Sequence, residues 1–368
     1  MTQPPITIES GELLALRLFD VAFAIDLAAA ERLWSTRAGS PGSRSRLTTA
    51  PPKALAFDVP PLRLVLEPFE VAIGGETVSV QLTARLYDFG VIALALRAAV
   101  THATWPVFSQ RFNAFDAALG DERGASLWLE QLRKVTERVG AAFERPSAAF
   151  VQEDYLIGIV RAFDRPFEGA VLREQVDLVG LLSGESRALS AMEQRELLQR
   201  SFSYFADDLV VLTWDRAFIY EPRGDFDVAD VIEVANAQLV EFRYYDELLD
   251  LELPRMYDRV ATAQRAAHRF AQLARQQYTL VAEVTELRER IDNALQVTED
   301  VYLARVYAAA LDLFRVPSVS AAVDRKLAIM RDTYAALYDE ASSRRAELLE
   351  IAIVLLIVIE IALALVKP

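Results

Sequence analysis

Few side chains in this sequence, apart from its carboxylates, could do chemistry. The only two histidines, His102 and His268, lie far apart, and neither has a partner at metal-ligand spacing. Adjacent acids occur at Asp207 and Asp208 and within residues 246–252, where a chain with 53 acidic residues produces such pairs by composition alone. An enzyme that uses acidic residues is therefore one alternative, but we expect no catalytic residue, no metal and no cofactor.

Other catalytic signatures are also absent from the sequence. There is no G-x-x-x-x-G-K-[ST] phosphate loop, no G-x-G-x-x-G dinucleotide motif and no G-x-S-x-G nucleophile elbow. The chain has no cysteine, which excludes disulfides, thiolate metal sites and cysteine nucleophiles. A formal net charge of -14 makes nucleic acid an unfavourable partner unless basic residues are segregated. The sequence therefore favours a protein that is not an enzyme.

One basic segment interrupts the acidic chain at residues 255–275, where only Asp258 opposes five arginines. Such a patch could meet anionic lipid head groups or RNA, so a membrane tether for ribosomes or RNA is a second alternative. We favour a solvated face that pairs with acids on a neighbouring helix. The arginines are Arg255, Arg259, Arg265, Arg269 and Arg275.

The most distinctive element of the sequence is the aliphatic segment at residues 348–366. Its nineteen residues span roughly 28 Å as a helix, close to the roughly 30 Å core of a bilayer. Fourteen of them are Leu, Ile or Val, whose summed insertion energy exceeds the penalty of about 3 kcal/mol for Glu360. The segment predicts a transmembrane helix, with a buried helix of a soluble domain as the alternative.

Charged residues at the ends of this segment indicate its orientation. Arg344 and Arg345 precede it and Lys367 follows it, while Glu350 can reach the interface. The positive-inside rule then places the bulk of the chain on the cytoplasmic side, as in a single-pass C-terminal tail anchor. The N-terminus shows neither a signal peptide nor a transit peptide. Because a carboxyl in lipid is unfavourable, we expect Glu360 to contact a second copy in a homo-oligomer or to reach toward the interface.

The first 225 residues predict an α+β domain with a mostly antiparallel sheet. Strand-like segments fill the first hundred residues, and Gly74-Gly75 predicts a hairpin turn. Residues 35–53 are rich in Ser, Gly, Pro and Arg, which is typical of a mobile loop. Helices follow from about 107 to 143, then a strand at 151–163, short helices to 199 and a hairpin at 208–222.

Residues 226–347 predict a long helical hairpin, and strands should disappear from Asp227 onward. Two heptad patterns mark its arms, with a break at the Val-Pro-Ser of residues 316–318. The second arm should continue into the membrane helix. The first heptad is Phe270, Leu273, Gln277, Leu280, Val284, Leu287 and Ile291, and the second is Val323, Leu327, Met330, Tyr334, Leu337 and Ala341.

Four stretches together resemble the required-for-meiotic-nuclear-division family, in the family's order. They are LYDFGVIALAL at 86–96, DDLVVLTWDRAFIY at 207–220, AQLVEFRYYDELLDLEL at 237–253 and RRAELLEIAIVLLIVIEIAL at 344–363. The resemblance covers roughly residues 80–368. Its signature residues are Arg243, Tyr244, Tyr245, Asp246, Leu249 and Asp250.

This resemblance implies a membrane-associated protein with a domain of unknown function and no enzymatic mechanism. Eukaryotic members include a mitochondrial inner-membrane protein that supports organellar translation as an anchoring or assembly factor. The present sequence lacks a mitochondrial targeting segment and prefers arginine to lysine, which argues for a bacterial plasma membrane. We therefore hypothesise a membrane scaffold or adaptor that binds protein partners or itself, in which Tyr244, Tyr245 and Asp246 pack the helical part against the sheet.

Overall fold

The structure is a computed structural model that divides the chain into two compact units. The first comprises Met1–Arg243 and Arg290–Pro317, and the second comprises Tyr244–Glu289 and Ser318–Pro368. The predicted domain boundaries at 225 and 347 stay predictions. The residues that the structure describes are 5–38, 43–44, 56–57, 59–147, 151–185, 187–225, 227–263, 279, 281–282, 284–285, 295–296 and 301–366.

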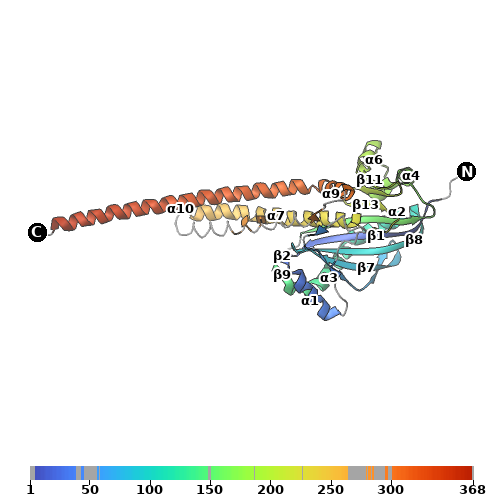
Figure 1. The fold of residues 1–368 in the computed structure, drawn as a ribbon, viewed down its shortest axis with the longest axis horizontal. Helices are drawn as coiled ribbons and strands as arrows, with labels where there is room; N and C mark the ends of the chain where they lie inside the picture. The colour runs from blue at the N-terminus through green and yellow to red at the C-terminus, as the bar shows by residue number, and fades with distance from the viewer. Residues whose placement is uncertain are drawn as a thin grey trace. The chain divides into compact units, whose positions relative to one another are not determined.

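A ten-stranded sheet forms the centre of the first unit (Figure 1). The strand order is β11-β12-β13-β10-β1-β8-β7-β5-β3, and β6 also pairs with β7. The pairs are antiparallel except for the parallel pair of β10 and β13. The prediction of a mixed α+β fold with a mostly antiparallel sheet is confirmed. The strands are β1 (Thr7–Asp20), β3 (Ser43–Arg44), β5 (Leu62–Val65), β6 (Phe69–Ile73), β7 (Glu76–Leu86), β8 (Val91–Thr104), β10 (Gln152–Phe163), β11 (Ser201–Phe202), β12 (Leu209–Leu212) and β13 (Arg216–Tyr220).

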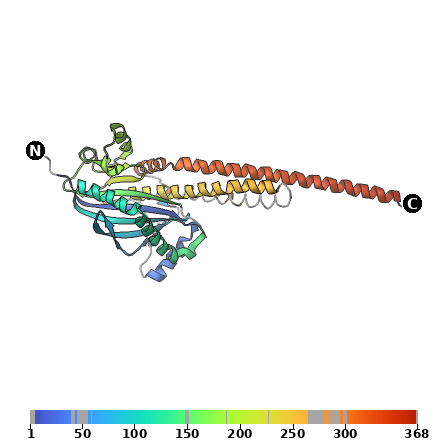
Figure 2. The ribbon, with the colours of Figure 1, turned by 180° about the vertical axis from the view of Figure 1, so that it is seen from behind.

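Strand alternation divides the side chains of the sheet between two faces. One face packs against α2 (Trp105–Gly120) and, through it, α3 (Glu122–Val139), and the helices can be followed in teal and green in Figure 2. Phe108 and Phe112 of α2 are fully buried and lie so close to Gly158 of β10 that a Cβ there would be 3.2–3.3 Å from their rings. Glycine at this position therefore lets α2 approach the sheet.

The first part of α7 (Asp227–Ala263) is buried on every side. All residues from 229 to 242 are buried, although five of them are polar. A helix that is enclosed on all faces needs partners for such groups, since an unpaired buried charge is costly. The five are Asp230, Glu233, Asn236, Gln238 and Glu241.

Smaller elements complete the first unit. Two short pairs join β2 (Ala22–Ile25) to β9 (Phe143–Pro146) and β4 (Ala56–Phe57) to β14 (Leu295–Gln296). The prediction that strands disappear after Asp227 is therefore wrong at β14, a strand of two residues that is too short to carry a periodic signal. The remaining helices are α1 (Leu27–Ala38), the 3₁₀ turn η1 (Gly140–Ala142), α4 (Gly169–Gln175), α5 (Leu178–Ser183), α6 (Ala191–Leu197) and α9 (Val301–Leu313).

Several local predictions can be compared with these elements. The hairpin turn at Gly74 and Gly75 is confirmed, with φ of 58° and 89° between β6 and β7. The hairpin at 208–222 is confirmed as β12 and β13. The proposed loop at 35–53 overlaps the end of α1 and all of β3, and its other residues lie outside those that the structure describes.

The break expected at residues 316–318 lies earlier in the chain. The chain turns at Phe314 and Arg315, where Arg315 has a φ of 56°, and α10 (Val316–Val366) begins directly afterwards. Pro317 therefore sits in the first turn of α10, where its missing N–H leaves no hydrogen bond unmade. Pro317 starts this helix and does not interrupt it.

The second unit contains the end of α7, short helical stretches between 279 and 285, and most of α10. The heptad residues Val323, Leu327 and Met330 are 1%, 4% and 0% exposed. Val284 of the first heptad is 1% exposed. The side chains of the other heptad positions lie outside those described: Phe270, Leu273, Gln277, Leu280, Leu287, Ile291, Tyr334, Leu337 and Ala341.

Candidate functional site

Helix α10 exposes an aliphatic surface that is uninterrupted from Ile351 to Ile359. Every residue from Ile351 to Ile361 is exposed, and the large aliphatic side chains among them are 46–65% exposed. Glu350 and Glu360 are exposed as well. Arg344 and Arg345 belong to the same helix, but their side chains lie outside those described. A contiguous apolar surface of this kind marks a site for a membrane or a protein partner.

A helix that crosses a bilayer needs about 20 mostly apolar residues. Taken singly, no helical stretch with described side chains is both long enough and apolar enough to cross a membrane, and the side chains of residues 344–349 and 362–366 lie outside those described. Within the described part of the chain, α9 and the first part of α10 meet the length and composition requirement only as a bent pair.

The segment singled out at residues 243–250 lies on α7. Arg243 forms an ion pair with Glu153 of β10. Tyr245 and Leu249 are 1% and 0% exposed, and the ring of Tyr244 packs edge-on against Tyr245 with centroids 5.3 Å apart. Tyr245 and Leu249 are thus core residues of α7, whereas the packing of Tyr244, Tyr245 and Asp246 against the sheet stays a prediction.

In the second unit, Lys326 of α10 lies between two carboxylates of α7. Its Nζ is 2.7 Å from Oδ1 of Asp246 and 2.7 Å from Oδ1 of Asp250, and it also donates to the Asp246 carbonyl at 3.1 Å. Burial alone would lower the pKa of Lys326, but hydrogen bonds to both aspartates raise it above its ordinary value. The two aspartates therefore fasten α7 to α10.

The predicted arginine patch is described only at its start. Arg255 is exposed and donates to Glu252 at 2.7 Å, as a local i, i+3 pair. Arg259 lies in α7, but its side chain lies outside those described, as do Arg265, Arg269 and Arg275 altogether.

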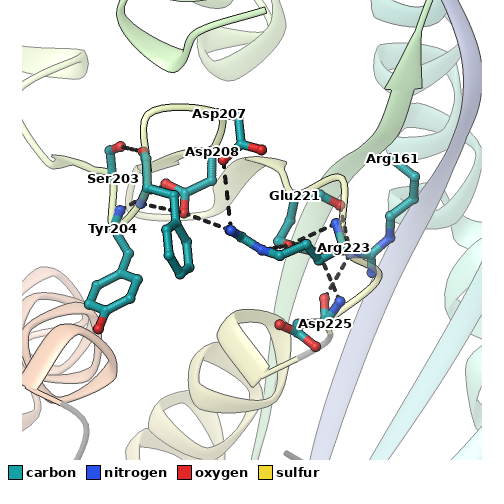
Figure 3. A network of polar contacts seen from close by, with 9 residues as sticks. Arg161, Ser203, Tyr204, Asp207, Asp208, Glu221, Arg223 and Asp225 are labelled. Carbon is teal, nitrogen blue, oxygen red and sulfur yellow. Dashed lines mark hydrogen bonds and ion pairs between the residues drawn. The ribbon is translucent and has the colours of Figure 1, made fainter. Parts of the chain in front are cut away.

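The first unit holds a polar network at the ends of β12 and β13, drawn in Figure 3. Asp208 is 4% exposed, and its carboxylate accepts the backbone N–H of Tyr204 at 2.8 Å and of Phe205 at 3.0 Å. Arg223 donates to Asp208 at 3.2 Å and to Glu221 at 3.1 Å. This network fixes the loop between β11 and β12.

The same network extends across the sheet through Glu221. Arg161 of β10 donates to a Glu221 carboxylate oxygen at 3.1 Å and to the Asp225 carbonyl at 2.7 Å. The backbone N–H of Asp225 donates to Glu221 at 2.8 Å. Burial lowers the pKa of Arg161, although Glu12 and Glu221 oppose that effect. Of these residues, only the adjacent acids Asp207 and Asp208 stand out in the sequence.

A second buried network joins β7 to α7. Arg85 donates to Asp230 at 2.9 Å and lies 3.2 Å from Glu233, whose carboxylate accepts the Tyr87 hydroxyl at 2.8 Å. Burial alone would lower the pKa of Arg85, but the two carboxylates raise it well above its ordinary value. Burial also raises the pKa of Tyr87 and of Glu233. Such paired charges hold α7 in one position on the sheet.

Asp20 is a buried carboxyl at the end of β1. It is 0% exposed, and the Ser147 hydroxyl donates to its two oxygens at 3.3 and 3.4 Å. Burial raises the pKa of Asp20 to about 7, against the opposing hydrogen bonds from Ser147 and the backbone of Ala22. Asp20 therefore titrates near neutral pH.

One small cavity of about 40 Å³ brings three carboxylates together. Asp116, Asp154 and Asp215 line it, and each lies within ion-pair distance of Arg17 or Arg216. Burial raises the pKa of Asp215. A cavity of this size holds a few water molecules and no organic substrate.

The described residues also bear on metal binding. His102 is exposed and pairs with Glu9 at 2.7 Å, while His268 lies outside the described part of the chain. Within that described part, no group of three His, Cys, Asp or Glu side chains is arranged to hold a metal ion.

The family is decided by comparison with known sequences. The family described as "Uncharacterized protein MJ0711, N-terminal domain" matches residues 10–227, more than half of the chain. The chain belongs to this family. "Uncharacterized protein MJ0711" of Methanocaldococcus jannaschii is 28% identical over 173 residues, which cover 47% of this chain and 53% of that protein. The match thus spans about half of the relative's length, and no solved structure matches.

The resemblance to the required-for-meiotic-nuclear-division family is therefore wrong. The match is to the MJ0711 N-terminal domain, and nothing in the comparisons indicates the other family. Two of the four stretches behind the resemblance, at 237–253 and 344–363, lie outside the matched range. Short aliphatic and Tyr-Asp-rich helical stretches arise readily in unrelated helices, because similar burial patterns select similar residues.

Proposed function

We propose that this protein of the MJ0711 N-terminal domain family is a membrane-anchored scaffold, with residues 348–366 as its span. The observation that carries the proposal is the run from Ile351 to Ile359, where aliphatic side chains are exposed on every face of the helix. An amphipathic helix at a membrane surface would keep a polar face, and a helix of a soluble core would be covered.

The energetics of insertion support this anchor. Fourteen Leu, Ile and Val side chains contribute roughly 0.3–0.6 kcal/mol each, or about 4–8 kcal/mol together. Glu360 opposes insertion by about 3 kcal/mol if it behaves like a central aspartate. A net gain of a few kcal/mol remains. Arg344 and Arg345 then favour a cytoplasmic position for the rest of the chain.

The scaffold part of the proposal also includes a helical hairpin whose second arm continues into the span. Its support is the burial of Val284 on one side and of Val323, Leu327 and Met330 on α10, together with the Lys326 bridge to α7. Such a hairpin would hold protein partners or further copies at the membrane.

Fractionation of cells tests the anchor. The wild-type protein should stay with membranes after a carbonate wash. A Val354→Arg, Ile357→Arg double variant adds a penalty of about 6 kcal/mol and should be released. Met192→Arg is the matched control, because Met192 is 77% exposed in the first unit, and it should behave as wild type. Release of the wild type by carbonate would overturn the anchor.

Glu360 provides a test of self-assembly. A carboxyl within a span is unfavourable in lipid, so we expect it to be buried against a second copy of the helix. Glu360→Leu should therefore insert normally but lose the oligomers that crosslinking in membranes detects for the wild type. Equal yields of crosslinked oligomer from both proteins would remove Glu360 from any assembly role.

A further inference from the structure

Two adjacent aromatic side chains protrude from the loop between β11 and β12. Tyr204 and Phe205 are 61% and 48% exposed, and their ring centroids are 4.6 Å apart at 89°. The Tyr204 ring also lies 5.4 Å from the ring of Tyr302 in α9. Aromatic rings dominate the energetics of protein interfaces. An exposed aromatic pair on a surface loop therefore indicates a surface that binds a partner.

The loop that carries these rings is held in one conformation. Both carboxylate oxygens of Asp208 accept backbone N–H groups, one from Tyr204 (Figure 3) and one from Phe205. The Ser203 hydroxyl donates to the Phe205 carbonyl at 2.5 Å, and the N–H of Gly169 donates to the Ala206 carbonyl at 2.8 Å. The rings are therefore positioned before any partner binds, which reduces the entropy cost of binding.

The charges around the rings decide which partner fits. The guanidinium of Arg223 lies 3.6 Å from the centre of the Phe205 ring, but acids already surround it. The network around Phe205 contains four acidic side chains and two arginines. Its net negative charge repels phosphates and anionic lipids. The acids are Asp207, Asp208, Glu221 and Asp225, and the arginines are Arg161 and Arg223.

We infer that Tyr204, Phe205 and Asp207 form a docking surface for a lysine- or arginine-bearing peptide segment of a partner protein. A cation is attracted to the face of an aromatic ring. Because Arg223 lies over Phe205, the Tyr204 ring is the face offered to a partner. Asp207, which is 3.7 Å from Arg223, keeps 54% of its side chain exposed for a second cation. The inference rests on the proposed scaffold function, for which it names the chemistry of one partner.

Peptide binding to the full-length chain in neutral detergent micelles tests the inference. The probe is a fluorescein-labelled ten-residue peptide that alternates lysine and serine, and its counterpart alternates glutamate and serine. Fluorescence anisotropy should show salt-sensitive binding of the lysine peptide alone. A Tyr204→Ala, Asp207→Asn double variant should bind it about tenfold more weakly, whereas Tyr204→Phe should keep most of the affinity because the ring remains.

The control is a Trp214→Ala, Asp332→Asn double variant. It also removes one exposed aromatic ring and one exposed carboxylate, and it should bind the lysine peptide as the wild type does. Equal loss in both double variants, or no loss in either, would show general attraction to an acidic chain and would overturn the docking surface. Binding of anionic vesicles that the Tyr204→Ala, Asp207→Asn variant abolishes would overturn it too.

Carbonate washing of the same variants separates this inference from the anchor. The docking variants should remain in membranes as the wild type does. If the wild type washes off while its peptide binding still depends on Tyr204 and Asp207, the anchor fails and the docking surface stands.

Discussion

Replacing Asp20 by asparagine should change how the stability of the protein depends on pH. Asparagine has the same size, and its side-chain oxygen can still accept the hydrogen bond of Ser147, but it cannot ionise. In the wild type, the carboxyl is 0% exposed and its pKa is raised to about 7 by burial. The substitution therefore removes one buried titration, and it also replaces one of the two acceptor oxygens by an NH2 group at every pH.

The direction in which stability changes with pH follows from the number of protons bound in the folded and unfolded states. The unfolded carboxyl has a pKa of 3.8, so between that pH and about 7 the folded state binds more protons than the unfolded state. Stability due to Asp20 is fully present below pH 3.8 and is lost as pH rises to about 7. At about 1.4 kcal/mol per pKa unit, a rise of roughly three units amounts to about 4 kcal/mol. Asp20→Asn should be more stable than wild type at pH 8, by up to this amount.

Urea unfolding of the full-length chain in detergent, followed by circular dichroism at pH 5 and pH 8, measures the difference. The gain in midpoint for Asp20→Asn relative to wild type should be larger at pH 8 than at pH 5. Asp332→Asn, at an exposed position, is the matched control. The control should change the urea midpoint by the same amount at pH 5 and pH 8. If Asp20→Asn also changes it by the same amount at both pH values, Asp20 does not carry a raised pKa, and the reasoning fails.

Three further substitutions test the packing and the buried networks. Val284→Ala should lower the free energy of unfolding by roughly 2 kcal/mol, because Val284 is 1% exposed; an unchanged urea midpoint would show that this face is open. Tyr87→Phe removes the buried hydrogen bond to Glu233 and should cost about 1–3 kcal/mol by the same assay, and a neutral result would mean that water replaces the hydroxyl. Lys326→Met should cost about 1 kcal/mol and make the midpoint less sensitive to salt, whereas an unaltered salt dependence would contradict a role for its two aspartate partners.

Sequence patterns predicted the local elements of this fold well. Alternating apolar residues gave the long strands, and the glycine pair at 74–75 gave the turn between β6 and β7, because only local sterics decide such features. Helix α1 was not predicted, although Asp26 accepts the N–H of Ala29 as a helix cap. Its apolar residues follow directly on the strand-like Ala22–Ile25, so the change in periodicity was hidden.

The polar networks could not be predicted from the sequence, because their partners are distant in the chain. Arg85 and Asp230 are separated by 145 residues, and only the folded sheet brings them together. The parallel pairing of β10 with β13 was missed for the same reason, since strand order depends on tertiary packing. The loop that presents Tyr204 was also missed, because the role of Asp208 as a double acceptor has no sequence signature.

The position of β1 in the middle of the sheet has a consequence for how the chain folds. Leu16 of β1 lies opposite Ala95 of β8 on one side and Tyr155 of β10 on the other. During synthesis this apolar strand must wait until about 160 residues have left the ribosome before both neighbours exist. Pairings over such sequence distances are slow to form, because loop closure precedes their stabilisation. The apolar residues of β1 therefore lack their second neighbouring strand in the nascent chain until β10 has been synthesised.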